Sequence, residues 1–192
     1  MNHDRARVRD PQAQHPGSPG QDHPPGVGVA GLQECHARAE AISLGAIKFF
    51  MLKTDAIRDL IFNPEESISF EGETGPYVQY AHARACSILR KAGKIRTHLQ
   101  YSLLQQSQEQ ALCKMLLAFP ITISDTASHC KPHVLCRYLL DLAQLFNEYY
   151  HAVPVISENE DLMAARLSLV DAVRQVIENG LTLLGITALK EM

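Results

Sequence analysis

The chain has 192 residues, 46% of them hydrophobic, which suffices for one domain of ordinary size with appendages. Its formal net charge of −3 excludes a generic polycation. Because no apolar run approaches about 18 residues, no secretory signal opens the chain, and the five cysteines lack paired spacing, we expect a cytoplasmic protein with reduced thiols and no membrane partner.

Residues 1–31 differ in composition from the rest of the chain. Proline and glycine interrupt them repeatedly, and large apolar side chains are almost absent. Such a segment cannot offset the entropy lost on ordering, so we predict a disordered tail. Residues 26–31 match the glycine spacing of a dinucleotide-binding loop, but two prolines stand where its strand should be, and we treat the match as chance.

A helix is predicted from about Leu32 to Leu52, with one apolar face formed by Ala39, Ile42, Ala46, Phe49 and Phe50. An irregular acidic segment follows and is broken by Asn63-Pro64. We expect that segment to wrap the surface on four apolar anchors, Ile61, Phe62, Ile68 and Phe70.

The next helix should begin at about Pro76, since proline is well tolerated at a first helical position. A period of 3.6 residues places Tyr77, Tyr80, Arg84 and Lys91 in one stripe. The neighbouring face is apolar and consists of Val78, Ala81, Ala85, Ile88, Leu89 and Ala92. One flank of this helix should therefore pack while the adjacent flank binds.

This helix and the residues after it are free of acidic side chains from Thr74 to Gln108. The basic residues there are Arg84, Arg90, Lys91, Lys94 and Arg96, with His82 and His98 beside them. Cations among tyrosines suit a single-stranded RNA loop, because cations meet phosphates and phenol rings stack on unpaired bases. A solvated basic helix with half-buried tyrosines is the alternative that periodicity alone leaves open.

The remaining pattern is helical. We predict a helix over residues 109–119 that Pro120 stops, then a short helix capped by Ser124 or Asp125. Two long amphipathic helices follow, from Pro132 to Pro154 and from about Glu160 to Leu183. Since no strand pattern of any length occurs, the predicted fold is an all-α antiparallel helical bundle.

The sequence contains no clear metal-binding or catalytic motif. The metal-capable side chains that stand closest together are His129, Cys130, His133 and Cys136, but no second ligand pair follows at a zinc-type spacing. We therefore expect no metal. No serine, cysteine or paired carboxylate stands in a recognisable catalytic context, so no catalytic residue is predicted.

Several segments, in order and at family spacing, resemble arginyl-tRNA synthetases. They are Ala46-Ile47-Lys48-Phe49, the run from Phe70 to Arg84, the pattern Pro132-His133 through Tyr138-Leu139, Leu142, Phe146-Asn147 and Tyr150, the run Ala165-Arg166-Leu167-x-Leu169, and the ending from Gly180 to Met192. The resemblance covers about Leu32 to the last residue. It corresponds to the end of the catalytic domain, residues 32–75, and a helical anticodon-binding domain of the DALR type, residues 76–192.

The resemblance implies a function. Such enzymes join arginine to tRNA(Arg) with ATP, and their C-terminal bundle grips the anticodon, whose middle base is always cytidine. By position, Tyr77, Tyr80, Arg84 and Met192 match the anticodon pocket, and His151 stands where some relatives place a stacking aromatic ring. Three further cations, Arg90, Lys91 and Lys94, are expected to meet the tRNA backbone, and DNA is not an expected partner.

The chain also departs from the family. The His-x-Gly-His and Lys-x-Ser-Lys-like elements that hold ATP occur nowhere in it. We therefore expect no cofactor in this chain and no activation of arginine by this chain alone. Two alternatives remain at this point: the tRNA-binding half of a split synthetase, and a helical scaffold that has lost RNA binding.

Overall fold

A computed structural model of the protein describes residues 29–93 and 99–192. Regular structure within these ranges is entirely helical, which confirms the predicted fold class. No helix in these ranges is both long and apolar enough to cross a lipid bilayer. The helices are α1 (Val29–Leu52), α2 (Pro64–Ser67), α3 (Gly75–Ala92), α4 (Ser107–His129), α5 (Pro132–Ala152) and α6 (Glu160–Leu183), with a 3-10 turn at Tyr101–Leu103.

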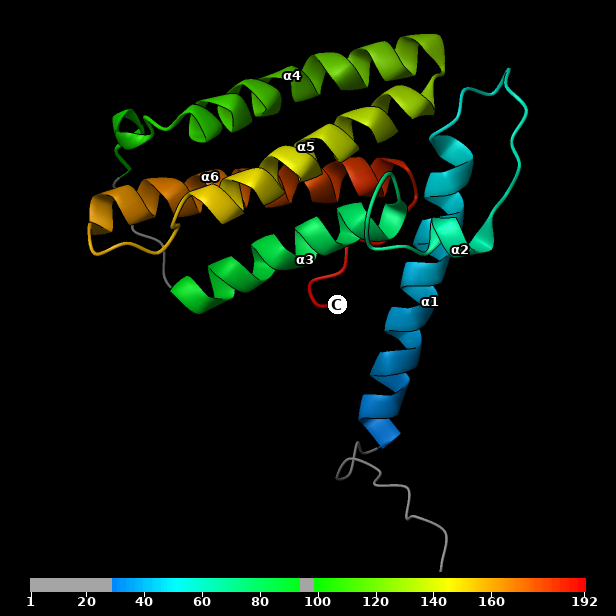
Figure 1. Ribbon diagram of the computed structural model, residues 1–192, viewed down its shortest axis with the longest axis horizontal. Helices are drawn as coiled ribbons and strands as arrows, with labels where there is room; N and C mark the ends of the chain where they lie inside the picture. The colour runs from blue at the N-terminus through cyan, green and yellow to red at the C-terminus, as the bar shows by residue number, and fades with distance from the viewer. Residues whose placement is uncertain (1–28, 94–98) are drawn as a thin grey trace, which may run out of the picture.

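Helices α3, α4, α5 and α6 lie side by side and alternate in direction, as an antiparallel bundle (Figure 1). Helix α5 packs on the other three. Its apolar residues recur at three- and four-residue steps, so one face enters the core with Leu135, Leu139, Leu142, Phe146 and Tyr149 all buried. The predicted face of α6 is likewise buried, at Ala165, Leu169, Val173, Ile177 and Leu181.

Helix α1 stands across one end of the bundle and packs on α3 (Figure 1). The two backbones approach closely where Gly45 faces Gly75, because a Cβ atom on Gly75 would lie 2.6 Å from the Gly45 carbonyl oxygen. Ala46 and Phe49 are buried at this crossing, whereas Ala39, expected on the same face, is exposed.

Helix α1 begins three residues before the predicted position, so residues 29–31 of the expected disordered tail are helical. The rest of that tail lies outside the described residues.

The prediction that Pro120 ends a helix is wrong. Helix α4 runs without interruption from Ser107 to His129 and contains Pro120. Proline lacks an N–H, so α4 forgoes one helical hydrogen bond at Pro120, which is exposed. Packing of α4 on α5 and α6 keeps both halves in one helix.

The four predicted anchors of the acidic segment are exposed, which corrects that expectation. Ile61 is 90% exposed, and Phe62, Ile68 and Phe70 are about half exposed. Phe62 and Phe70 each meet one ring, since their centroids lie 5.2 Å from Phe50 and 6.5 Å from Tyr80. The segment is therefore tied to α1 and α3 at two points without adding a core of its own.

Candidate nucleic-acid interface

The start of α3 fixes the direction in which its tyrosines and arginine point. The Thr74 hydroxyl accepts a hydrogen bond from the Tyr77 N–H at 3.2 Å, and Pro76 occupies the first turn. Val78, Ala81 and Ala85 then face the core with no exposed area. With that face packed, the adjacent face of α3 is turned toward α5 and the surface.

Arg84 is the centre of a cluster on this adjacent face. Its guanidinium carbon lies 4.7 Å from the ring centroid of Tyr80 and 5.0 Å from that of Tyr150 on α5. The guanidinium also donates to the Asn147 side-chain oxygen at 2.8 Å and to the Tyr80 hydroxyl at 3.2 Å. A planar cation is thus held in one orientation by two helices.

Tyr77 reaches Arg84 through Asn147 and does not contact it directly in the hydrogen bonds of this cluster. Its ring is half-buried against the core, and its hydroxyl accepts a hydrogen bond from the Asn147 amide at 3.0 Å. Asn147 in turn accepts from Arg84, so Tyr77 holds Arg84 through Asn147. Tyr77 is not among the residues that line the hollow described next.

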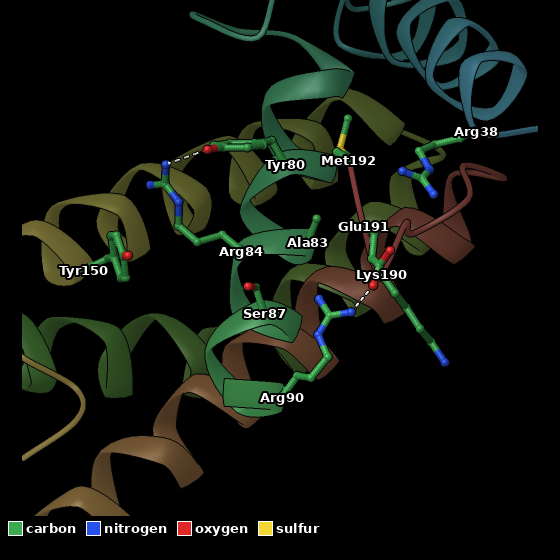
Figure 2. Close-up of a pocket in the computed structure, with 10 residues that line it drawn as sticks. All are labelled: Arg38, Tyr80, Ala83, Arg84, Ser87, Arg90, Tyr150, Lys190, Glu191 and Met192. Atoms are coloured by element: carbon green, nitrogen blue, oxygen red, sulfur yellow. Dashed lines mark hydrogen bonds and ion pairs between the residues drawn. The ribbon is translucent and has the colours of Figure 1, made fainter. Parts of the chain in front are cut away.

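The hollow has a volume of about 430 Å³ and opens between α1, α3, α5 and the C-terminal segment (Figure 2). Tyr80 and Met192 both line it, and Arg90 and Glu191 form an ion pair at its edge. Its charged lining is Arg38, Arg84, Arg90, Lys190 and Glu191. Four cationic side chains and one side-chain carboxylate surround a space lined also by Tyr80 and Tyr150, a combination that suits an anion with an aromatic part.

The C-terminal segment reaches this hollow because α3 and α1 hold its backbone. After the turn at Gly185, the buried side-chain amide of Gln79 donates to the Thr187 carbonyl at 2.8 Å. Lys48 of α1 donates to the Gly185 carbonyl. The Leu189 carbonyl lies 2.7 Å from Nδ1 of His82. These bonds bring Met192 to the mouth of the hollow.

His82 does not belong to the positive field in which the sequence places it. The side chain is fully buried, and burial lowers the pKa of its imidazole, although the Leu189 bond acts in the opposite direction. Because a carbonyl oxygen can only accept, Nδ1 must carry the proton. His82 is a neutral donor that fastens the C-terminal segment.

The three cations predicted to meet a tRNA backbone have three different surroundings. Arg90 forms an ion pair with Glu191. Lys91 is exposed and lines a second hollow, beside Val153 and Ile156, of which Arg84 and Tyr150 are also part. Lys94 lies outside the described residues.

Sequence reasoning missed several contributors to the first hollow, among them Arg38, Lys190 and Tyr150. Arg38 lies on α1, far in the sequence from Arg84, and no local sequence pattern identifies it as part of a site. Tyr150 stood within the family resemblance, but no spacing linked it to Arg84. His151 is exposed and meets the edge of Tyr150, at 5.6 Å between ring centroids, without lining the hollow.

The metal-capable side chains near the start of α5 are dispersed. His129 contacts Asp125, while His133 lies 3.7 Å from the Asp55 carboxylate. Cys136 is buried, and burial raises the pKa of its thiol to about 12. Within the described part of the chain, no group of three His, Cys, Asp or Glu side chains could hold a metal ion.

Comparison with known proteins places this chain in a family. The chain is 41% identical over 155 residues to arginine–tRNA ligase of Clostridioides difficile. The match covers 80% of this chain and 27% of the relative. It is 44% identical over 155 residues to arginine–tRNA ligase of Clostridium botulinum strain Alaska E43. That match covers 80% of this chain and 28% of the relative. The chain therefore spans less than a third of the length of these relatives.

Solved structures agree. Arginyl-tRNA synthetase of Thermus thermophilus superposes with a TM-score of 0.77 at 45% identity, over 80% of this chain and 27% of that one. The enzyme of Plasmodium falciparum superposes with a TM-score of 0.71 at 25% identity, over 84% and 30%. Residues 78–192 match the family described as DALR anticodon binding domain. The chain belongs to the DALR anticodon-binding domain family and matches the C-terminal part of arginyl-tRNA synthetases.

Proposed function

We propose that this chain binds the anticodon arm of tRNA(Arg) and takes the middle cytidine of the anticodon into the hollow between α3, α5 and the C-terminal segment. The observation that supports this most directly is the Arg84 guanidinium held between Tyr80 and Tyr150. Residues 76–192 would form the anticodon-binding domain, and residues 32–75 the end of the catalytic domain of such a ligase. Tyr77 then serves the site by holding Asn147 and Arg84 in place.

The chemistry of the hollow fits an unstacked cytosine. The N3 and O2 atoms of cytosine accept hydrogen bonds, and Arg84 has five N–H donors. The hydrogen bonds to Asn147 and Tyr80 use two of these donors. Tyr80 is 38% exposed and lines the hollow together with Met192, so its ring is available to stack on the base. Stacking of a base on an aromatic ring contributes about 1–3 kcal/mol.

Charge supports the same proposal. Arg38, Arg90 and Lys190 surround the hollow, and Lys91 lies on the same side of α3 beside the second hollow. Lys94 comes two residues after the end of α3 in the sequence and is proposed to meet the backbone with Arg90 and Lys91. Phosphate contacts of this kind release counterions, so the affinity should fall steeply as salt rises.

The test is a gel shift with tRNA(Arg) and with the same tRNA carrying another middle anticodon base, at several salt concentrations. We expect tighter binding to the unaltered tRNA at every salt concentration. Equal binding to both would limit the function to contact with the backbone, and no binding at low salt would reject tRNA as the ligand. Aminoacylation itself would require the parts of the ligase that this chain does not span.

A further inference from the structure

The side of α4 that faces away from the bundle carries large apolar side chains that are open to solvent. Leu117 and Ile121 are 80% and 71% exposed, and they stand about one helical turn apart. On the opposite side of the same helix, Leu112 is buried and Phe119 packs against the core. Helix α4 therefore has a second apolar surface besides the one that it packs on α5 and α6.

This second apolar surface continues onto neighbouring segments. Leu117 lines a recess of about 420 Å³ together with Tyr101, which is 59% exposed and precedes α4. Pro120 lines another recess, of about 590 Å³, together with Leu183, which ends α6 and is 61% exposed. Contiguous exposed apolar surface of this kind marks a site of interaction.

Three side chains of α4 carry a permanent charge. Glu109 is buried in an ion pair with α6, whereas Lys114 and Asp125 are exposed. These two stand about three helical turns apart, so they lie on one face with Leu117 and Ile121 between them. We call the surface defined by Lys114, Leu117, Ile121 and Asp125 the α4 outer face.

We infer that the α4 outer face is an interface between two copies of this chain. A twofold axis across the middle of α4 sets the two helices antiparallel and forms every contact twice. Lys114 of each copy then faces Asp125 of the other, and the apolar side chains meet between the two ion pairs. A parallel arrangement would instead set each charge against its own copy, which costs free energy.

Both charges are available for such pairs. Lys114 is exposed and forms no ion pair with another residue that the structure describes. Asp125 lies 2.9 Å from His129 on the same helix, but both of these side chains are more than half exposed, so the carboxylate keeps an open side toward solvent. Burial of the apolar side chains would supply most of the free energy of association, and the charges would fix the direction of the two helices.

Two other occupants fit this face less well. Residues 1–28 contain no Leu, Ile, Phe or Tyr, so they offer little apolar surface to cover it. RNA would meet one carboxylate for one lysine there, whereas four cationic side chains line the hollow at α3. A second copy of the chain matches both the apolar and the charged part of the face.

The position of α4 keeps this interface away from the proposed RNA site. In Figure 1, α5 and α6 lie between α4 and α3, and the C-terminal segment lies beyond α3. A dimer built on the α4 outer face therefore leaves the hollow of each copy open to a tRNA.

The experiment measures the association of the full chain by sedimentation equilibrium over a range of protein concentrations. We expect a monomer–dimer equilibrium for the unaltered chain and monomer alone for Leu117→Glu, Ile121→Glu. The matched control is Leu44→Glu, Ile47→Glu, which alters apolar positions on α1 that are 47% and 46% exposed and should leave the dimer intact. Circular dichroism checks that every variant is folded.

An exchange of charges tests the antiparallel arrangement. Lys114→Asp makes both charged positions of the face acidic, and Asp125→Lys makes both basic. Each variant alone should therefore dimerise at least about tenfold more weakly than the unaltered chain. An equimolar mixture of the two variants should regain the dimer, and so should the chain that carries both substitutions, because an acid again faces a base across the axis.

The remaining outcomes would overturn the inference. They are a chain that stays monomeric up to its highest soluble concentration, a dimer that survives Leu117→Glu, Ile121→Glu, and a dimer that the α1 control abolishes. A dimer that neither charge variant weakens would overturn the antiparallel pairing. Binding of tRNA by Leu117→Glu, Ile121→Glu is measured separately and should be unchanged, so self-association and the proposed function can fail independently. If this variant loses tRNA instead, the α4 outer face belongs to an RNA site and the inference fails.

Discussion

Helices α5 and α6 of the bundle and the segment of residues 29–74 differ in how completely they bury their large apolar side chains. In the bundle, the long amphipathic faces of α5 and α6 are buried to the last turn, as at Tyr149 and Leu181. In the segment, α1 buries one face on α3 and leaves Ile47 and Met51 exposed on the other. The bundle therefore completes its core within the described residues, whereas α1 covers only one of its two apolar faces there.

The largest effect that this comparison predicts is on stability. Leu142→Ala removes a side chain with no exposed area, so we expect a loss of roughly 2–5 kcal/mol in the free energy of unfolding. Ile61→Ala in the other region removes a side chain that is 90% exposed and should change it by less than about 0.5 kcal/mol. Urea unfolding followed by circular dichroism measures both. Similar losses for the two variants would mean that Ile61 is covered in solution.

The bundle could be predicted from the sequence because its helices are amphipathic and clearly bounded. The α6 range and the start of α5 at Pro132 follow from period and caps alone. Pro120 was misjudged because the local rule for proline ignores packing on two neighbouring helices. The apolar residues of the acidic segment were misjudged because sequence does not reveal whether a surface exists to receive them.

The site was predictable where one helix carries it. Tyr80 and Arg84 share a stripe on α3, and a helical period suffices to find them. The contributions of Arg38 and Tyr150 depend on how α1 and α5 cross α3, which is a tertiary fact. His82 shows the same limit, because its charge state depends on burial against a segment more than a hundred residues away.

The second prediction compares the two regions at the hollow they share. Arg84 is oriented by Tyr80, Tyr150 and Asn147, whereas Arg38 reaches the same hollow from α1. We expect Arg84→Ala to weaken binding of tRNA(Arg) by about 1–3 kcal/mol, as for a contact to a base edge. Arg38→Ala should weaken binding less, and equally for a tRNA with another middle base, as for a phosphate contact.

Two controls accompany this measurement by gel shift. Arg84→Lys keeps the charge but loses the planar guanidinium, so it should resemble Arg84→Ala if orientation matters. Arg137→Ala removes a cation that is paired with Glu73 and Asp141 and does not line the hollow, so binding should not change. If Arg38→Ala has the larger effect, α1 and not the bundle reads the base.

The third prediction concerns the C-terminal segment, which is bonded to both α1 and α3. Burial lowers the pKa of His82 from its ordinary value of 6.5, so the unfolded chain takes up a proton at a higher pH than the folded chain. The stability that the neutral imidazole contributes is present above pH 6.5, the ordinary pKa of histidine, and is lost as the pH falls below 6.5. Nearby Glu178 acts against the lowered pKa, while Arg174 and Lys190 add to it.

Urea unfolding at pH 7.5 and pH 5.5 tests this coupling. The difference between the two pH values should be smaller in His82→Asn than in the unaltered chain, because asparagine can donate to Leu189 but does not titrate there. Equal pH dependence in both proteins would show that other histidines account for it.

The smallest predicted effect is at the ion pair of Arg90 and Glu191. Both side chains are more than half exposed, so the pair contributes little to stability, yet Glu191 has the one side-chain carboxylate among the described residues that line the hollow. A phosphate that approaches Arg90 must compete with it. We therefore expect Glu191→Gln to tighten tRNA binding, by roughly two- to fivefold, and less at high salt. Glu178→Gln, on α6 and paired with Arg174 outside the hollow, is the matched control and should leave binding unchanged. Weaker binding in Glu191→Gln would mean that the carboxylate holds Arg90 in its binding position instead of competing for it.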